Sequence, residues 1–176
     1  MKFLIVVDMQ NDFITGSLGS KAAEDILPAV CDKIRSYKND SAKLFMTLDT
    51  HFKDYLSTSE GKKLPVEHCI KGTIGWEPAE EVANAIGDCA EVFEKNTFGS
   101  VKLAQTIASL AKAGDTVELC GLCTDICVVS NALLIKAFCP EVEVIIDAKC
   151  CAGVTNESHE AALATMRSCQ CTIENF

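Results

Sequence analysis

Long apolar runs and clusters of positive charge are both missing from this sequence of 176 residues. A membrane-spanning helix needs about 20 apolar residues in a row, and because no stretch approaches that length we expect no membrane association. The formal net charge is −9. Phosphate binding needs clustered lysine and arginine, so we also expect no nucleic-acid partner. The apolar run at the start of the chain is short and ends at Asp8, which predicts a buried strand in place of a signal peptide.

Internal repeats, low-complexity segments and linkers are absent as well. The length corresponds to one domain with a sizeable core, and we predict a single domain over residues 1–176. Cysteine, in contrast, is abundant, with eleven residues. Without an export signal, we expect a cytoplasmic protein whose thiols stay reduced and pack as small apolar groups. One C-x-x-C pair, Cys120 and Cys123, has no second pair to complete a structural zinc site.

Strand-like and helix-like segments alternate along the chain. Strands are predicted at 2–8, 43–49, 91–94, 116–120, 143–147 and 171–173. Helices are predicted at 22–37, 77–86, 101–110, 124–138 and 155–166. Alternation of this kind predicts an α/β fold with three layers, α/β/α, around a mainly parallel, Rossmann-like central sheet.

In open sheets of this type, ligands bind at the carboxyl ends of the strands. The polar or reactive groups expected there are Asp8, Asp49, Glu94, Lys95, the segment 121–127 and Asp147. The polar segment from about 50 to 75 is too long for a plain connection, so we expect it to contribute to function.

Cys127 is the cysteine best placed for chemistry. It lies in the first turn of a predicted helix that Thr124 can cap and whose positive end suits Asp125. Free N–H groups in such a turn favour a thiolate and can hold an oxyanion. Asp8 at the same sheet edge can take the thiol proton, and the charge of Lys95 would lower the thiol pKa and keep Asp8 ionised. Taken separately, the three residues also fit packing, a turn and a solvated charge.

A second group of polar residues has the composition of a metal site. Asp49, His51 and His68 offer one carboxylate and two imidazoles, a set that leaves coordination positions open for water or substrate. A strand-end aspartate with nearby loop histidines also occurs as a plain hydrogen-bonded loop, and the spacing leaves both interpretations open.

Three stretches of the sequence together resemble one family. The segment 6–13, Val-Val-Asp-Met-Gln-Asn-Asp-Phe, looks like the opening motif of the isochorismatase-like cysteine hydrolases. The segment 121–128, Gly-Leu-Cys-Thr-Asp-Ile-Cys-Val, resembles their nucleophile motif. Asp147 with Ala148, followed by 159–163, is similar to their closing strand and helix. The resemblance covers essentially the whole chain in the right order.

This resemblance implies a catalytic triad and an oxyanion site. The triad falls on Asp8, Lys95 and Cys127. Family members carry a cis peptide bond at the position of Leu122 and Cys123, which directs the N–H groups of Cys123 and Cys127 toward the oxyanion.

Segments 48–51 and 67–73, which contain Asp49, His51 and His68, resemble the metal-binding segments of the nicotinamidase branch of the family. The resemblance implies one divalent ion held by Asp49, His51 and His68, with zinc as the first choice and iron or manganese as alternatives. The ion would bind the pyridine nitrogen of the substrate. Phe13 would stack on the ring. The implied reaction converts nicotinamide to nicotinate and ammonia through a thioester, in NAD salvage, and we expect a homo-oligomer.

The match to that branch has gaps. Many nicotinamidases have a tryptophan where this chain has Pro65, and Trp76 could line the pocket in its place or pack in the core. The sequence therefore leaves two alternatives open. One is a related cysteine hydrolase acting on another small amide or an acyl-urea, and the other is an inactive binding relative.

Overall fold

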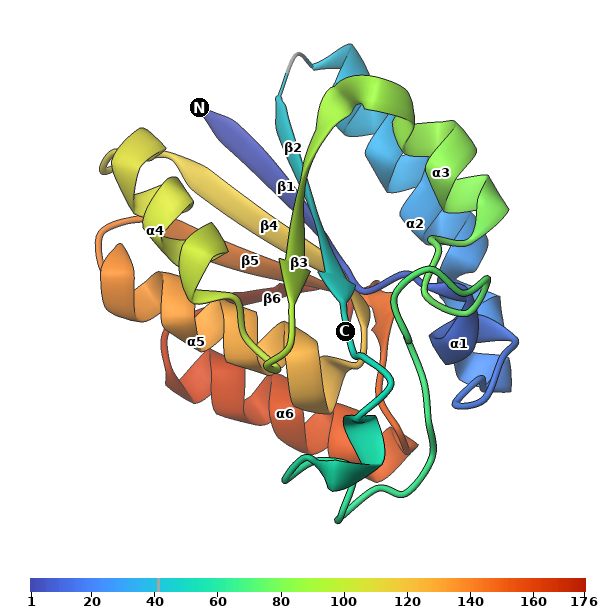
Figure 1. Ribbon diagram of the computed structural model, residues 1–176. Helices are drawn as coiled ribbons and strands as arrows, with labels where there is room; N and C mark the ends of the chain where they lie inside the picture. Colours follow the sequence, from blue (N-terminus) through green and yellow to red (C-terminus); the bar gives the residue numbers. More distant parts are fainter. Residues whose placement is uncertain (41) are drawn as a thin grey trace.

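A computed structural model describes residues 1–40 and 42–176 of the chain (Figure 1). Six strands form one sheet in the order β3-β2-β1-β4-β5-β6, and every pairing between neighbours is parallel. The strands are β1 (Lys2–Val7), β2 (Lys43–Asp49), β3 (Ala90–Lys95), β4 (Thr116–Leu122), β5 (Glu143–Ala152) and β6 (Thr172–Glu174). The predicted α/β fold is confirmed, and the described sheet is wholly parallel where a mainly parallel one was expected.

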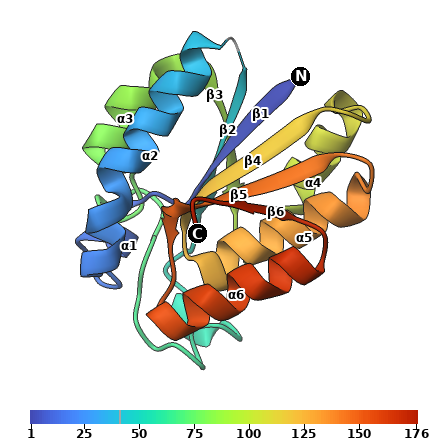
Figure 2. The same ribbon diagram turned by 180° about the vertical axis from the view of Figure 1, so that it is seen from behind.

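Helices cover both faces of this sheet, as Figures 1 and 2 show from opposite sides. One face carries α1 (Asn11–Ile14), α2 (Lys21–Asn39) and α3 (Glu80–Ile86), and the other carries α4 (Val101–Leu110), α5 (Val129–Phe138) and α6 (Asn156–Ser168). Short helical turns lie at η1 (Tyr55–Ser57), η2 (Gly87–Cys89) and η3 (Thr124–Val128). No helix among the described residues has the length and apolar character required to cross a bilayer.

The central strand β1 is apolar from Phe3 to Val7 because both of its faces are buried there. Phe3, Ile5 and Val7 pack into the cluster under α4, α5 and α6, while Leu4 and Val6 pack into the cluster under α2 and α3. All five side chains have no exposed surface, and burying such a side chain is worth about 1.5–3 kcal/mol. A parallel strand between two helical layers shows this continuous apolar pattern in place of alternation.

The strand order reverses between β1 and β4, which makes this point the topological switch of the sheet. The two strands approach each other closely there. A side chain at Gly121, where φ is +119°, would place its Cβ 2.1 Å from the Val7 carbonyl oxygen. Only glycine fits this contact. Crevices for ligands form outside the carboxyl ends of strands at such a switch point, and the candidate site lies there.

One predicted helix begins later than expected. We placed Pro78 in the first turn of a helix over 77–86, but the residue precedes α3 and pairs with Gln10 in an isolated antiparallel bridge. The N–H of Ala79 donates to the Met9 carbonyl oxygen at 2.9 Å. These contacts hold the chain extended beside the end of β1, and the helix starts only after them.

Two further boundaries differ from the prediction. The helix expected over 124–138 consists of the wide π turn η3 followed by α5. The strand expected over 143–147 continues to Ala152. Asp147 is consequently a mid-strand residue, and its Oδ2 lies 2.7 Å from the ammonium of Lys33 on α2. The prediction that Asp147 lies at the ligand edge of the sheet was wrong.

Candidate active site

Asp8 directly follows β1 and is fully buried. Its φ of 46° is unusual for a residue with a side chain, and it turns the chain out of the sheet. The Thr47 hydroxyl donates to Asp8 Oδ1 at 2.6 Å. Oδ2 lies 2.6 Å from the Lys95 ammonium but accepts no hydrogen bond of good geometry from the described residues. One carboxylate oxygen thus remains available for a proton.

Lys95 ends β3 and pairs in register with Asp49 on β2. Its ammonium donates to Cys127 Sγ at 3.4 Å and lies 3.6 Å from Asp49 Oδ1. Burial would lower the pKa of Lys95, but the charges of Asp8, Cys127 and Asp49 outweigh it and raise this pKa. The side chain therefore stays positively charged among its acidic neighbours.

Cys127 lies in η3 and is buried, with 5% of its surface exposed. Burial raises the pKa of the Cys127 thiol, the Asp8 carboxylate raises it further, and Lys95 opposes both. The expected lowering by Lys95 is present, but it is not the largest effect. Burial likewise raises the pKa of Asp8 against the opposing charge of Lys95. A neutral thiol beside a carboxyl group with a raised pKa is an arrangement that suits general-base removal of the thiol proton.

The turn that carries Cys127 differs from the predicted capped helix. Cys123 occupies the N-cap position without a side-chain cap, and its carbonyl oxygen accepts the N–H groups of Ile126 and Val128. Thr124, the expected cap, instead places its hydroxyl 2.8 Å from Nδ1 of His159. The peptide bond between Leu122 and Cys123 is cis, as the family resemblance implied.

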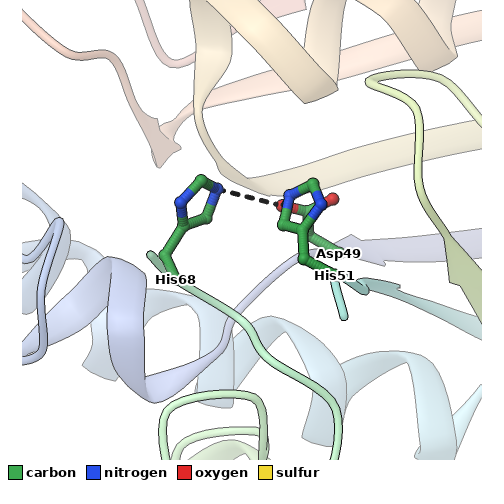
Figure 3. A group of neighbouring side chains, drawn as sticks. All are labelled: Asp49, His51 and His68. Atoms are coloured by element: carbon green, nitrogen blue, oxygen red, sulfur yellow. Dashed lines mark hydrogen bonds and ion pairs between the residues drawn. The ribbon is translucent and has the colours of Figure 1, made fainter. Parts of the chain in front are cut away.

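Asp49, His51 and His68 meet at the mouth of this crevice with one potential ligand atom each within 4.8 Å of the others. His51 Nε2 lies 3.1 Å, and His68 Nε2 3.5 Å, from Asp49 Oδ2. Figure 3 shows the His68 imidazole facing the Asp49 carboxylate. Sequence reasoning missed Glu60, whose Oε1 lies 3.7 Å from Nε2 of both histidines. Nothing in the spacing of the loop residues would have identified it.

The chemistry of this donor set fits a divalent metal. His68 Nδ1 lies 2.8 Å from the Val66 carbonyl oxygen. That contact assigns the ring proton to Nδ1 and leaves Nε2 free as a ligand, as in known metal sites. An ionised carboxylate and two neutral imidazoles are ligands for zinc and similar ions.

Buried polar and aromatic side chains fix the metal-type residues in place. Gln10 Nε2 donates to the carbonyl oxygens of Asp49 and Trp76 at 2.9 and 2.8 Å, and Gln10 Oε1 accepts the Asp49 N–H at 2.7 Å. The Tyr55 ring lies 4.6 Å from that of His51 and 5.0 Å from that of His68. No separate signal in the sequence identifies Gln10 or Tyr55, because their roles depend on contacts with the folded 50–78 loop.

A cavity of about 1050 Å³ connects both groups of residues. Cys127, His51, His68 and Phe13 line it, and the Phe13 ring centroid lies 5.6 Å from that of His68. Trp76 is not among the lining residues: it packs against the core cluster under α2 and α3, and its indole N–H donates to the Thr50 hydroxyl at 2.9 Å. The Cys127 thiol, the Phe13 ring and the two histidines therefore open into one space.

Comparison with known proteins agrees with the family resemblance found in the sequence. A model of the isochorismatase domain matches residues 2–175. The nicotinamidase of Saccharomyces cerevisiae is 29% identical over an alignment covering 49% of this chain and 52% of that protein, so the chain spans about half the length of this relative.

Solved structures resemble the chain over almost its full length. The pyrazinamidase of Pyrococcus horikoshii in complex with zinc is 28% identical, with a TM-score of 0.84 and coverage of 99% of both chains. The pyrazinamidase/nicotinamidase of Streptococcus mutans UA159 has a TM-score of 0.86 at 24% identity, covering 98% of this chain and 99% of its own. The latter is a likeness of fold.

Proposed function

Because the chain belongs to the isochorismatase family, we propose that it is a cysteine amidohydrolase that converts nicotinamide, or a closely related pyridine amide, to the acid and ammonia. We place the reaction in a single domain over residues 1–176, in the cytoplasm, as a step of NAD salvage. Asp8, Lys95 and Cys127 are the catalytic residues of this proposal, and Phe13 packs on the substrate ring.

One observation supports the proposal above the others. The Cys127 thiol and the imidazoles of His51 and His68 line the same cavity, and the Lys95 ammonium contacts both Cys127 and Asp49. A ring held at the histidines can therefore present its amide to the sulfur. The nicotinamidase and pyrazinamidase relatives agree with this choice of substrate.

The first half of the reaction forms a thioester. Asp8 takes the Cys127 proton on Oδ2, and the thiolate attacks the amide carbonyl carbon. The developing oxyanion lies against the N–H groups of Cys123 and Cys127, and one such donor is typically worth about 3–4 kcal/mol in the transition state. The C–N bond then breaks as Asp8 returns the proton to the nitrogen, and ammonia leaves.

The second half releases the acid. Asp8, ionised again, removes a proton from a water molecule that attacks the thioester carbon. The tetrahedral intermediate collapses, the C–S bond breaks, and the sulfur leaves as a thiolate that takes the proton back from Asp8. Lys95 stabilises the negative charge on Asp8 and on the sulfur through both halves, because its ammonium contacts each of them.

Asp49, His51 and His68 would hold one divalent ion, zinc or alternatively iron or manganese, with Glu60 close enough to supply a further oxygen after a small shift. When bound, such an ion supplies a Lewis acid for the ring nitrogen and so orients the substrate. The thiol chemistry then depends on Asp8 and Lys95 alone.

The cavity size favours a second candidate, a related hydrolase for a larger amide or an acyl-urea. About 1050 Å³ is the upper end of what drug-sized ligands occupy, and nicotinamide is much smaller. An inactive binding relative is a weaker alternative, since Asp8, Lys95 and Cys127 are all present and in contact.

Ammonia release from a panel of amides tests the proposal. Nicotinamide and pyrazinamide should be hydrolysed, and benzamide, which lacks the ring nitrogen, should be a poor substrate. Preferential hydrolysis of an acyl-urea or a larger amide would replace the pyridine amides with the second candidate. If no amide releases ammonia and Cys127 does not react with iodoacetamide, the chain is not a cysteine hydrolase.

A further inference from the structure

The turn that carries Cys127 is fastened to α6 by side chains outside the proposed catalytic set. Thr124 has no exposed surface, and its hydroxyl oxygen lies 2.8 Å from Nδ1 of His159, a half-buried residue in the first turn of α6. No other side-chain hydrogen bond of the Thr124 hydroxyl is found among the described residues. Removing the imidazole therefore leaves this buried hydroxyl without its side-chain partner, which costs free energy.

A second contact joins the same two segments. The N–H of Val154 donates to Asp125 Oδ1 at 3.1 Å. Gly153 packs so closely on His159 that an added Cβ would lie 2.8 Å from the histidine Cβ. The backbone and Cβ of His159 are therefore packed against this loop, and the hydrogen bond of the imidazole links the loop and α6 to Thr124.

Thr124 lies in the chain between Cys123 and Cys127, whose N–H groups bind the oxyanion in the proposed mechanism. Its neighbour Cys123 follows the cis bond, and Cys127 lies three residues later in the same turn. We propose that His159 is a positioning residue that holds η3, through the Thr124 hydroxyl, in the conformation that directs the N–H groups of Cys123 and Cys127 at the oxyanion. This inference rests on the proposed function and adds to it a residue more than 30 positions from the nucleophile.

The protonation state of His159 suits this role. Burial lowers the pKa of His159, opposed by the facing charges of Asp125 and Glu160. The neutral imidazole has one donor and one acceptor nitrogen and can pair with a hydroxyl in either sense. The link to Thr124 is consequently maintained at the neutral pH where hydrolysis would be measured.

Paired substitutions test the link. His159→Leu and Thr124→Val should each lower kcat roughly 10- to 100-fold and leave KM within about threefold, because an oxyanion contact acts mainly in the transition state. The double variant should lose no more than the worse single variant, since both changes break one hydrogen bond. His159→Asn, whose side-chain amide reaches the position of Nδ1, should restore most of kcat.

A matched control separates positioning from simple stabilisation of α6. Ser158→Ala removes the side chain that completes the Thr155 capping box at the start of the same helix, but it leaves His159 in place. This variant should lower the melting temperature without lowering kcat. A loss of kcat in Ser158→Ala that matches its loss of stability, or additive losses in the double variant, would overturn the proposal.

A second measurement does not depend on turnover. Pyridine-3-carbaldehyde can add to the Cys127 sulfur as a thiohemiacetal, whose oxygen needs the same N–H donors. Its affinity, followed with a carbonyl-labelled sample by NMR, should fall roughly 10-fold or more in His159→Leu and recover in His159→Asn. If the parent protein binds the aldehyde but hydrolyses no amide, the proposed function fails while His159 is still tested. Equal aldehyde affinity in the parent and His159→Leu, or no adduct in either, would refute the role of His159.

Discussion

The molecule contains two buried clusters of the same residue types, and only one of them has the properties of an active site. In the first, Lys95 contacts Asp8 and Cys127. In the second, beneath α2, Lys33 contacts Asp147 at 2.7 Å and the Cys150 thiol donates to the same carboxylate oxygen at 3.5 Å. Each cluster therefore combines a lysine, an aspartate and a cysteine.

The two clusters differ in their hydrogen bonding and in their access to space. Both oxygens of Asp147 are engaged, Oδ1 by the Lys149 N–H at 3.1 Å and Oδ2 by Lys33. Glu118 is likewise paired with Lys33 and with the Tyr37 hydroxyl. Asp8 Oδ2 is ion-paired as well, with Lys95 at 2.6 Å, but it accepts no well-directed hydrogen bond from the described residues. Cys127 also lines the large cavity, and Cys150 is not among its lining residues. A charged triad becomes a candidate for catalysis when its thiol opens into a cavity, and burial with charge is not sufficient.

The sharpest test of this comparison removes the thiol of each cluster in turn. Cys127→Ala should lower kcat for amide hydrolysis by at least about 10⁴-fold, because the Cys127 thiol contacts Lys95, whereas no such contact is found among the described residues for Cys123, the other thiol that lines the cavity. The circular dichroism spectrum should remain that of the parent. Cys150→Ala removes the thiol from the second cluster and should leave kcat within about threefold. Substantial turnover by Cys127→Ala would exclude it as the nucleophile.

Removal of the metal should have the next largest effect. His68→Ala, or treatment with a chelator, should lower hydrolysis of nicotinamide and pyrazinamide by roughly 100-fold, because substrate orientation is lost. The rate at which iodoacetamide alkylates Cys127 should stay close to that of the parent. Elemental analysis should find about one metal ion per chain in the parent and little in His68→Ala.

Two outcomes would change the interpretation of the metal cluster. If the metal-free protein is inactive toward every amide while Cys127→Ala keeps some turnover, the nucleophile is a hydroxide generated at the metal. If no metal is found and chelators have no effect, Asp49, His51 and His68 form a hydrogen-bonded loop, and the substrate would then be an unspecified amide.

Substitution of Lys95 should shift the pH dependence of the site. The positive charge lowers the pKa of both Cys127 and Asp8, although burial raises each of them overall. In Lys95→Met both pKa values should therefore rise further. Alkylation of Cys127 and the acid limb of kcat/KM should move to higher pH, by about one unit or more. Unchanged profiles would show that Lys95 does not act on the thiol.

Lys33→Met makes the corresponding change in the second cluster and should have the smallest effect on turnover. It leaves two buried carboxyl groups unpaired, which typically costs about 3–5 kcal/mol of stability, while kcat stays within about twofold. Burial would raise the pKa of Asp147, but Lys33 outweighs it and lowers this pKa. A depressed carboxyl pKa stabilises the fold above the ordinary value near 4 and loses that contribution as pH falls through the folded value. The stability gap between parent and Lys33→Met, measured by urea unfolding, should accordingly narrow at acid pH.

The sequence predicted the layout of the fold and most of the candidate site, for a clear physical reason. Asp8 directly follows β1, and Asp49 and Lys95 end β2 and β3, and the carboxyl ends of parallel strands lie at one edge of the sheet. Their neighbourhood could thus be predicted from strand order alone. The family resemblance is confirmed by the domain match over 2–175. The catalytic roles of the residues stay predictions until they are tested.

The parts that could not be predicted depend on contacts between distant segments. Thr124 has the usual N-cap signature, but its hydroxyl pairs with His159 from another helix. Glu60 reaches the histidines because the Thr58 hydroxyl accepts the Gly61 N–H and bends the loop back. Asp147 was misplaced because β5 runs on past it, through a register irregularity opposite β4. No local pattern in the sequence encodes these three arrangements.

Burial of Cys127 has a consequence for the lifetime of the protein in an oxidising cell. Peroxides attack thiolates far faster than thiols, and the pKa of Cys127 is raised by burial. The resting sulfur is accordingly protonated, and it becomes nucleophilic only when Asp8 takes its proton as an electrophile arrives. All eleven cysteines are free, so sulfur is plentiful, but the one that performs the proposed chemistry is protected between turnovers. Inactivation by hydrogen peroxide should thus be slow in the resting protein and should accelerate with rising pH.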